Sequence, residues 1–174
     1  MRNVTPDSIE LDAHDACQAA QAAMGAKDWP SVMALLGKAL TDSVSDWPLK
    51  AFLDFGHAAA QLGFHAKAAA AYEKARERDP GNATGWRGGA FAASRRGAWG
   101  EAAELWRGCM ARSPEANQQV WWWSALGEAL SKLEQWEEAS ATYATMRERW
   151  PDNPLGWRGG AFVASRRTEW AAAV

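Results

Sequence analysis

Apolar and small residues recur at the spacing of an α-helix along most of the chain. Between residues 49 and 80 they follow the steps i, i+3, i+4 and i+7 in two successive segments, which indicates two amphipathic helices. The first segment carries Phe52, Phe55, Gly56 and Ala59, and the second carries Ala68, Tyr72 and Ala75. Gly63 lies between them and predicts a short turn. The same pattern continues on both sides, so the fold class is predicted to be all-α.

Stretches that contain proline divide this pattern into units of similar length. DPGN at 79–82, SPEAN at 113–117 and PDNP at 151–154 each stop a helix and allow another to start. Pro80 and Pro114 are 34 residues apart, and Pro114 and Pro151 are 37 residues apart. A two-helix repeat follows from these intervals. The predicted units are 13–46, 49–82, 83–116, 120–153 and an incomplete 154–174, after an N-terminal tail or capping segment at 1–12.

One stretch of twelve residues occurs twice. GWRGGAFAASRR at 85–96 returns as GWRGGAFVASRR at 156–167, with eleven positions identical and an offset of 71 residues. This offset equals two repeat units. Adjacent glycines inside a helix cost about 1 kcal/mol each relative to alanine, so their repetition calls for an explanation. Either Gly89 and Gly160 let helices touch closely, or Gly88 and Gly159 leave room for a ligand backbone beside Phe91 and Phe162.

The units also share a signature of aromatic and small residues. An aromatic residue early in the first helix is followed four residues later by a small one, and the second helix has an alanine near its start, an aromatic residue in its middle and a proline after its end. Examples of the first pair are Phe52 and Gly56, Trp86 and Ala90, Trp123 and Gly127, and Trp157 and Ala161. This pattern resembles the tetratricopeptide repeat (TPR) family. The resemblance implies a right-handed superhelical solenoid of antiparallel helix pairs, with the first helices lining a concave groove.

Most of the 12 tryptophans occupy repeated positions. Trp29, Trp99, Trp136 and Trp170 share the start of the second helix, whereas Trp86, Trp123 and Trp157 share an early position in the first. We expect these side chains, and Trp106 in mid-helix, to pack between helices. The three consecutive residues Trp121 to Trp123 cannot all face the core. The resemblance turns Trp123 inward and Trp121 toward the groove, where Trp121 either anchors a partner or packs on the insertion near 115–117.

The resemblance also assigns side chains of the first helices to the groove. The candidate partner-binding residues are Arg87, Phe91, Arg95, Trp121, Lys132, Arg158, Phe162 and Arg166. The arginines either form a solvated helix face or hold carboxylates and carbonyls of a partner through forked hydrogen bonds. TPR domains that grip an acidic chaperone C-terminus use a clamp of Lys and Asn. That clamp is absent, because the matching positions hold Cys17, Gln21, Asp54, Thr84 and Gly88.

Composition narrows the function further. The net charge of −2 gives no global basic field, so nucleic acid is disfavoured as a partner. The two cysteines have no metal-site spacing, and no catalytic, phosphate-binding or dinucleotide motif occurs, so we predict no enzyme activity, no metal and no cofactor. His14, Cys17 and His57 are a weaker idea for a metal or thiol site. A polar N-terminus and the lack of any apolar run of roughly 18 residues predict a cytoplasmic protein without a membrane span.

The predicted function is protein–protein recognition through the groove, with an extended or helical acidic and apolar segment as partner. The chain stops within an apolar last helix, so we expect it to be part of a longer protein, since solenoids need a polar cap. The alternative is the substrate-docking TPR region of a larger modifying enzyme, such as a bacterial TPR-glycosyltransferase, with the catalytic domain after residue 174. Self-association through the C-terminal end is a third alternative.

Overall fold

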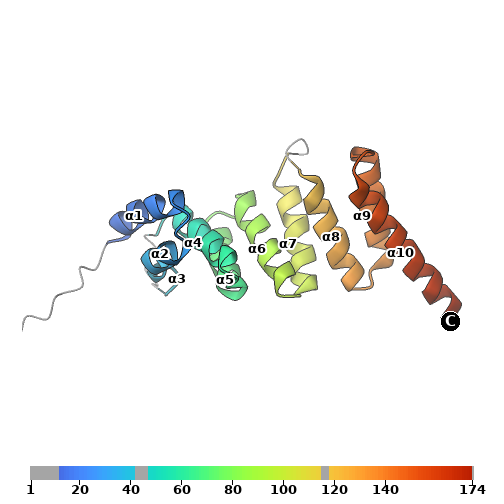
Figure 1. The fold of residues 1–174 in the computed structure, drawn as a ribbon, viewed down its shortest axis with the longest axis horizontal. Coiled ribbons are helices and arrows are strands. Elements are labelled where there is room, and N and C mark those ends of the chain that lie inside the picture. Colours follow the sequence, from blue (N-terminus) through green and yellow to red (C-terminus); the bar gives the residue numbers. More distant parts are fainter. Residues whose placement is uncertain (1–11, 42–46, 115–117, 174) are drawn as a thin grey trace, which may run out of the picture. The chain divides into compact units, whose positions relative to one another are not determined.

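The computed structural model describes residues 12–41, 47–114 and 118–173, with side chains up to Thr168. The described part contains helices and no strand, so the all-α fold class is confirmed (Figure 1). The predicted tail at 1–12 and the insertion at 115–117 lie almost wholly outside it. The helices are α1 (Ala13–Gly25), α2 (Trp29–Leu36), α3 (Lys38–Thr41), α4 (Leu49–Gln61), α5 (His65–Arg78), α6 (Ala83–Arg95), α7 (Trp99–Ala111), α8 (Val120–Lys132), α9 (Trp136–Arg149) and α10 (Pro154–Ala173).

The chain forms two compact units, residues 1–78 and 79–174. In the first unit α1 packs on α2, α2 on α4, and α4 on α5. Short polar side chains start its first helices: Asp12 accepts a hydrogen bond from the backbone N–H of Asp15, and Asp28 accepts one from that of Ser31. Val32, Leu36, Phe55 and the buried alanines of α4 and α5, such as Ala58 and Ala68, belong to the core.

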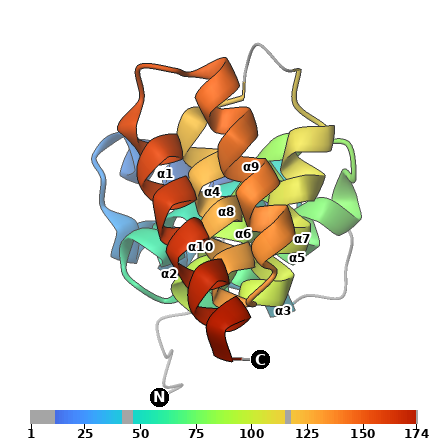
Figure 2. The same ribbon diagram turned by 90° about the vertical axis from the view of Figure 1, so that its right-hand side faces the viewer.

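In the second unit each helix packs on the next, from α6 to α10. α8 also contacts α10 directly, and Figure 2 shows these two helices beside α9. The core that joins the five helices is built of alanines and a few large side chains, chief among them Trp106, Trp122, Leu126, Leu130, Tyr143, Met146 and Val163. Alanines allow the helices to approach closely, and the large side chains fill the remaining space.

The aromatic residue of a second helix lies against a glycine of a first helix, as the repeat signature predicts. A Cβ atom on Gly56 would lie 2.9 Å from the Tyr72 ring, and a Cβ on Gly127 would lie 2.6 Å from the Tyr143 ring. The Tyr143 ring also touches α10, because a Cβ on Gly159 would come within 2.1 Å of it. Tyr143 is therefore held between two positions that tolerate no side chain.

The turns between paired helices use a left-handed backbone. Gly63 and Gly97 have φ of 78° and 72°, and Lys27 and Glu134 occupy the equivalent positions with φ of 57° and 59°. Only glycine adopts this conformation without steric cost. In the second copy of the duplicated stretch, Thr168 replaces Gly97 at the residue that follows it. α10 continues through Thr168 without a turn, so the predicted second helix near Trp170 does not form.

One face of α10 is not covered by any described residue. Ala90 and Ala93 of α6 are fully buried in the core that includes α7, whereas the matching Ala161 and Ala164 of α10 are exposed. Trp157 is 58% exposed, so the prediction that it packs between helices is wrong. Its counterpart Trp86 lies against Gly108 of α7, and α10 has no such partner helix among the described residues. Each indole N–H donates a hydrogen bond of 2.9 Å to the backbone carbonyl of the proline six residues earlier, Pro80 for Trp86 and Pro151 for Trp157.

The packing of the Tyr143 ring against Gly127 and Gly159 predicts the effect of Gly127→Ala. The added methyl group must displace a ring that Gly159 already confines, so we expect the unfolding free energy to fall by roughly 1–3 kcal/mol. Urea unfolding monitored by circular dichroism measures this change. Gly100→Ala is the matched control, because nothing lies within 4 Å of its Cβ position, and it should leave stability unchanged or raise it by up to about 1 kcal/mol. Equal effects of the two substitutions would contradict the conclusion that the Tyr143 ring leaves no room for a side chain at residue 127.

The turn geometry predicts opposite signs for two substitutions at equivalent positions. Glu134→Gly removes the cost of a left-handed non-glycine residue, so we expect stability to rise by about 0.5–1 kcal/mol after the greater unfolded-state freedom of glycine is deducted. Gly97→Ala introduces the same cost and should lower stability by about 1 kcal/mol. Thermal unfolding of the two variants beside the wild-type chain tests both, and a stabilised Gly97→Ala variant would refute the explanation.

Candidate functional site

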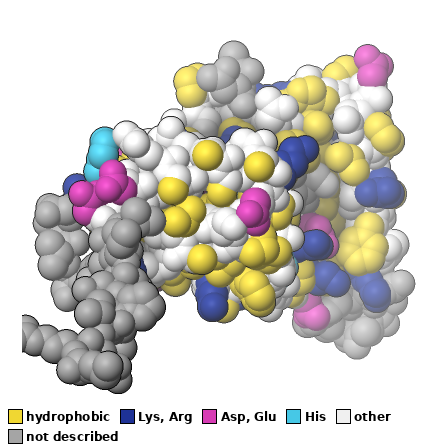
Figure 3. All heavy atoms as spheres, turned by 60° about the vertical axis from the view of Figure 1, so that its left-hand side comes forward, with side chains coloured by type: hydrophobic (Ala, Val, Ile, Leu, Met, Phe, Trp, Pro, Cys, Tyr) yellow, Lys and Arg dark blue, Asp and Glu magenta, His cyan; other side chains and the backbone are white. Residues whose placement is uncertain are grey.

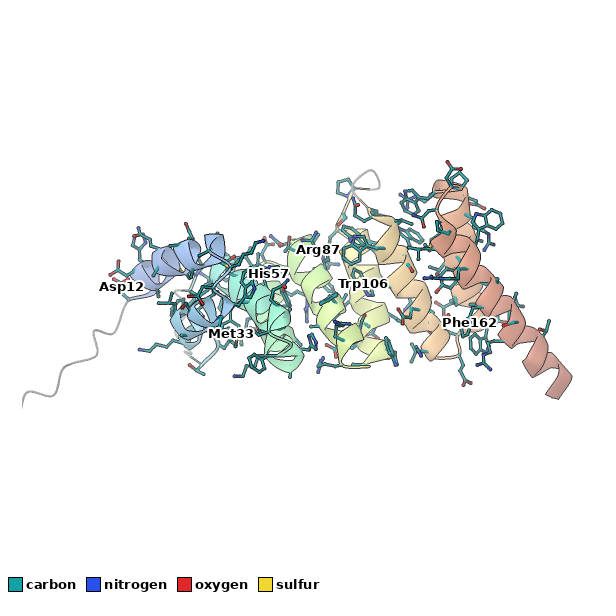
Figure 4. All side chains as sticks on the ribbon, viewed as in Figure 1. Asp12, Met33, His57, Arg87, Trp106 and Phe162 are labelled. Carbon is teal, nitrogen blue, oxygen red and sulfur yellow. The ribbon has the colours of Figure 1, made fainter. Side chains whose placement is uncertain are left out.

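The first helices of the second unit, α6, α8 and α10, carry all eight residues predicted to bind a partner. Each of the eight is exposed, and we call the surface that they form the A-helix face: Arg87, Phe91, Arg95, Trp121, Lys132, Arg158, Phe162 and Arg166. Figure 4 labels Arg87 on α6 and Phe162 on α10, with Trp106 on α7.

The duplicated stretch places the same pair of side chains on α6 and on α10. The guanidinium of Arg95 lies 5.7 Å from the centre of the Phe91 ring, and that of Arg166 lies 5.6 Å from the centre of the Phe162 ring. These phenylalanines are 40% and 47% exposed. A helix places residues four apart on the same face, which explains both pairs. Each pair offers an apolar ring next to a fixed positive charge.

The burial of the three consecutive tryptophans, Trp121 to Trp123, differs in part from the prediction. Trp122, not Trp123, is the buried member, at 5% exposure, and Trp121 is 43% exposed. Trp123 is half-buried and donates a hydrogen bond of 3.2 Å to the side chain of Gln118. Trp121 lies edge-on to Trp106 and to Trp122, with ring centres 5.4 Å and 5.9 Å apart. Trp123 also packs against the core of the second unit, as the family register predicted, but it is less buried than Trp122.

Two other candidate cations also contact tryptophans. Arg87 of α6 lies 5.9 Å from the ring of Trp122, and Lys132 of α8 lies 5.9 Å from the ring of Trp99. Such cation–π contacts contribute about 0.5–1 kcal/mol at exposed sites.

A cavity of about 360 Å³ opens between α8, α9 and α10. Its lining combines apolar, aromatic and charged side chains: Ser124, Glu128, Tyr143, Leu155, Arg158, Gly159 and Phe162. Burial raises the pKa of the Tyr143 phenol, a side-chain hydrogen bond with Ser131 lowers it, and the nearby charges of Glu128 and Arg158 act in opposite directions. The phenol is therefore neutral at physiological pH, and it lines the cavity with a polar group that carries no charge.

The structure decides between the two explanations of Gly159. The approach of the Tyr143 ring accounts for the missing side chain, so the prediction that Gly159 leaves room for a ligand backbone is wrong. At the next residue, a Cβ on Gly160 would meet only Nη1 at the end of the flexible Arg147 side chain closely, and it would lie 3.8 Å from Cβ of Tyr143, so close helix packing does not explain Gly160. The candidate set left out Tyr143 and Leu155, which also line the cavity. Leu155 lies on a first helix, where the repeat register could have pointed to it, whereas Tyr143 lies on a second helix.

The A-helix face has an uneven charge. The groove positions of α6, α8 and α10 hold five basic side chains, Arg87, Arg95, Lys132, Arg158 and Arg166, and one carboxylate, Glu128. The exposed aromatic residues Phe91, Trp121 and Phe162 lie on the same helices as these charges. On the side that Figure 3 brings forward, Lys and Arg side chains also lie among hydrophobic ones. This mixture differs from a continuous basic stripe and suits a ligand that is both acidic and apolar.

The first unit has a smaller cavity of about 260 Å³, lined by His14, Cys17, Gln18, Gln21, Leu36, Pro48, Lys50, Ala51 and Asp54. Lys50 and Asp54 form an ion pair there. Burial raises the pKa of the Cys17 thiol, and the Asp54 carboxylate raises it further. His57 is not part of this lining and lies edge-on to Trp29. The described residues contain no group of three or more His, Cys, Asp or Glu side chains placed to hold a metal.

Comparisons with known proteins place the fold. No protein-family model matches the sequence, and no curated protein matches it. Among solved structures, MamA AMB-1 has a TM-score of 0.76 at 17% identity and covers 93% of this chain and 86% of its own. The first TPR of Spaghetti (RPAP3), bound to the HSP90 peptide SRMEEVD, has a TM-score of 0.61 at 20% identity and covers 69% of this chain and 93% of its own. The chain has the fold of TPR domains.

The Arabidopsis OM64 TPR domain agrees, with a TM-score of 0.58 at 21% identity over 66% of this chain and 93% of its own. The resemblance read from the repeat signature is thus confirmed at the level of the TPR fold. The further idea of a bacterial glycosyltransferase parent finds no match among these structures. No helix in the described ranges is long and apolar enough to cross a membrane.

Proposed function

We propose that this chain is a protein-interaction module whose TPR array binds an acidic segment with apolar side chains on the A-helix face. The observation that carries the proposal is the combination of five basic side chains with exposed Phe91, Trp121 and Phe162 on one set of helices. Aromatic residues and arginines dominate binding energy at protein interfaces, so this composition favours a protein partner.

The bound peptide in the Spaghetti (RPAP3) structure supports a peptide as the ligand class, since SRMEEVD is short and carries two glutamates and an aspartate. The Lys and Asn clamp of such domains is absent here, so the ligand would be held by arginine pairs and rings instead. No catalytic role is assigned to any described residue. In a longer modifying enzyme the same face would serve to dock the substrate protein. The two free cysteines fit a reducing compartment such as the cytoplasm.

A charge reversal tests the proposal. A displayed library of random peptides is selected on the wild-type chain, and selected peptides are measured by fluorescence anisotropy at two salt concentrations. We expect acidic sequences with aromatic or aliphatic residues, and a loss of at least about tenfold in affinity for the Arg87/Arg95/Arg158/Arg166→Glu variant, since each lost charged contact costs about 1.5–3 kcal/mol when its partner is buried.

The matched control reverses four cations that lie off this face, Lys27, Lys67, Lys74 and Arg107, and so changes the net charge by the same amount. It should retain the affinity of the wild-type chain after a correction for long-range attraction at higher salt. Circular dichroism shows whether both variants are folded. Equal loss in both variants would mean that general charge attraction explains the binding, and the A-helix face would then be rejected as the site.

Self-association is a second candidate function, favoured by the uncovered face of α10. Trp157, Ala161 and Ala164 match residues that α7 covers in the first copy, so a helix of a second chain fits there. We expect the molar mass, measured by light scattering after size exclusion, to rise with concentration. Ala161→Glu should abolish this rise, and Ala141→Glu on an exposed position of α9 should not. A constant monomer mass would reject self-association.

A further inference from the structure

The cavity between α8, α9 and α10 has an internal counterpart one repeat earlier. α8 and α9 begin 37 residues after α6 and α7, and α10 begins 34 residues after α8. At these offsets every lining residue has an equivalent. Ser124 and Glu128 correspond to Arg87 and Phe91, Tyr143 to Trp106, and Leu155, Arg158, Gly159 and Phe162 to Trp121, Ser124, Ala125 and Glu128.

The counterpart is occupied by the chain itself. Trp121 stands where Leu155 stands, and its indole lies edge-on to Trp106, with an interplanar angle of 89° and ring centres 5.4 Å apart. Edge-to-face contact at this distance is a preferred geometry of aromatic pairs. In the later repeat the smaller Leu155 leaves the space beside Tyr143 open, and this space is the cavity of about 360 Å³.

We infer that this cavity is an anchor site for an aromatic side chain of the partner, which would take the place that Trp121 fills one repeat earlier. The inference rests on the proposed function and specifies one residue type in the ligand. The lining matches such a guest. The rings of Tyr143 and Phe162 provide apolar contact, Arg158 provides a cation for the face of a ring, and the Glu128 carboxylate accepts a hydrogen bond from an indole N–H or a phenol O–H.

The same lining disfavours other guests. A purely aliphatic side chain would make no polar contact with Glu128 or Arg158, and an acidic side chain would gain from Arg158 but meet the like charge of Glu128 in the cavity. Acidic residues of the ligand are better placed outside, where Arg166 lies over the Phe162 ring. The partner segment would therefore carry an aromatic residue flanked by acidic ones.

The test uses 5-fluoroindole, a neutral probe of the guest, observed by fluorine NMR. A fragment of this size binds with a Kd on the order of millimolar at best. We expect saturable binding to the wild-type chain. Leu155→Trp puts an indole into the cavity and should weaken probe binding at least tenfold. Leu133→Trp, the same substitution at an exposed leucine at the end of α8, should bind the probe as the wild-type chain does.

The reverse substitution, Trp121→Leu, is expected to increase probe binding. An increase is a useful complement, because a variant that fails to fold would be expected to lose the site. Trp121→Leu removes the indole that covers Trp106, so the amount of probe bound below saturation should increase, because a second space is opened beside an aromatic ring. Phe162→Ala removes a ring that lines the cavity and should weaken probe binding several-fold. No saturable binding to the wild-type chain, or undiminished binding to a folded Leu155→Trp variant, overturns the anchor.

The outcome separates this inference from the proposed function, because the probe has no charge. Selected acidic peptides that bind while 5-fluoroindole does not would leave the function in place and remove the anchor. Probe binding without any peptide binding to the A-helix face would keep the anchor and reject the acidic partner. If both the probe and the peptides bind, the aromatic residue of a selected peptide is replaced by alanine. This replacement should lower the affinity of the peptide for the wild-type chain at least tenfold and have little effect on its affinity for the Leu155→Trp variant.

Discussion

The second unit depends on the close contact between the aromatic residue of a second helix and the bare backbone of first helices. Tyr143 is the clearest case, since its ring lies where a Cβ on either Gly127 or Gly159 would be. A rigid ring held from two sides fixes the distance between α8, α9 and α10 better than a flexible side chain does. The glycines are unfavourable in a helix by themselves, so their cost is offset only by this packing.

The candidate site is a consequence of the same contact. Because the Tyr143 ring lies against both α8 and α10, the residues that line the space beside it determine whether that space is filled or open. In the earlier repeat Trp121 covers Trp106, and in the later one Leu155 leaves a cavity beside Tyr143. The same helix arrangement thus gives a filled and an open version of the site, and the residue at the position of Trp121 and Leu155 is one of the lining residues that differ.

The duplicated twelve residues show how the surroundings decide the role of identical side chains. Their outward residues behave alike in both copies, since the Phe91–Arg95 and Phe162–Arg166 pairs have nearly the same geometry. Their inward residues differ. Ala90 and Ala93 are buried in the core with α7, whereas Ala161 and Ala164 are exposed on a helix that continues through Thr168. A left-handed turn needs a residue that accepts a positive φ, and a β-branched threonine resists it.

The sequence by itself determined the local features: helical periodicity, the stops near the prolines, the glycine turns and the residues that the repeat register turns outward. These features follow from the spacing of side chains within one helix and from backbone sterics, so a single chain segment contains the information. The exposure of all eight candidate residues agrees with that register. The tertiary structure alone decided which of three adjacent indoles is buried, that Gly159 serves Tyr143 and not a ligand, that α10 has an uncovered face, and that a cavity opens beside Leu155. Each of these depends on the distance and rotation between helices, which packing sets and which no single segment specifies.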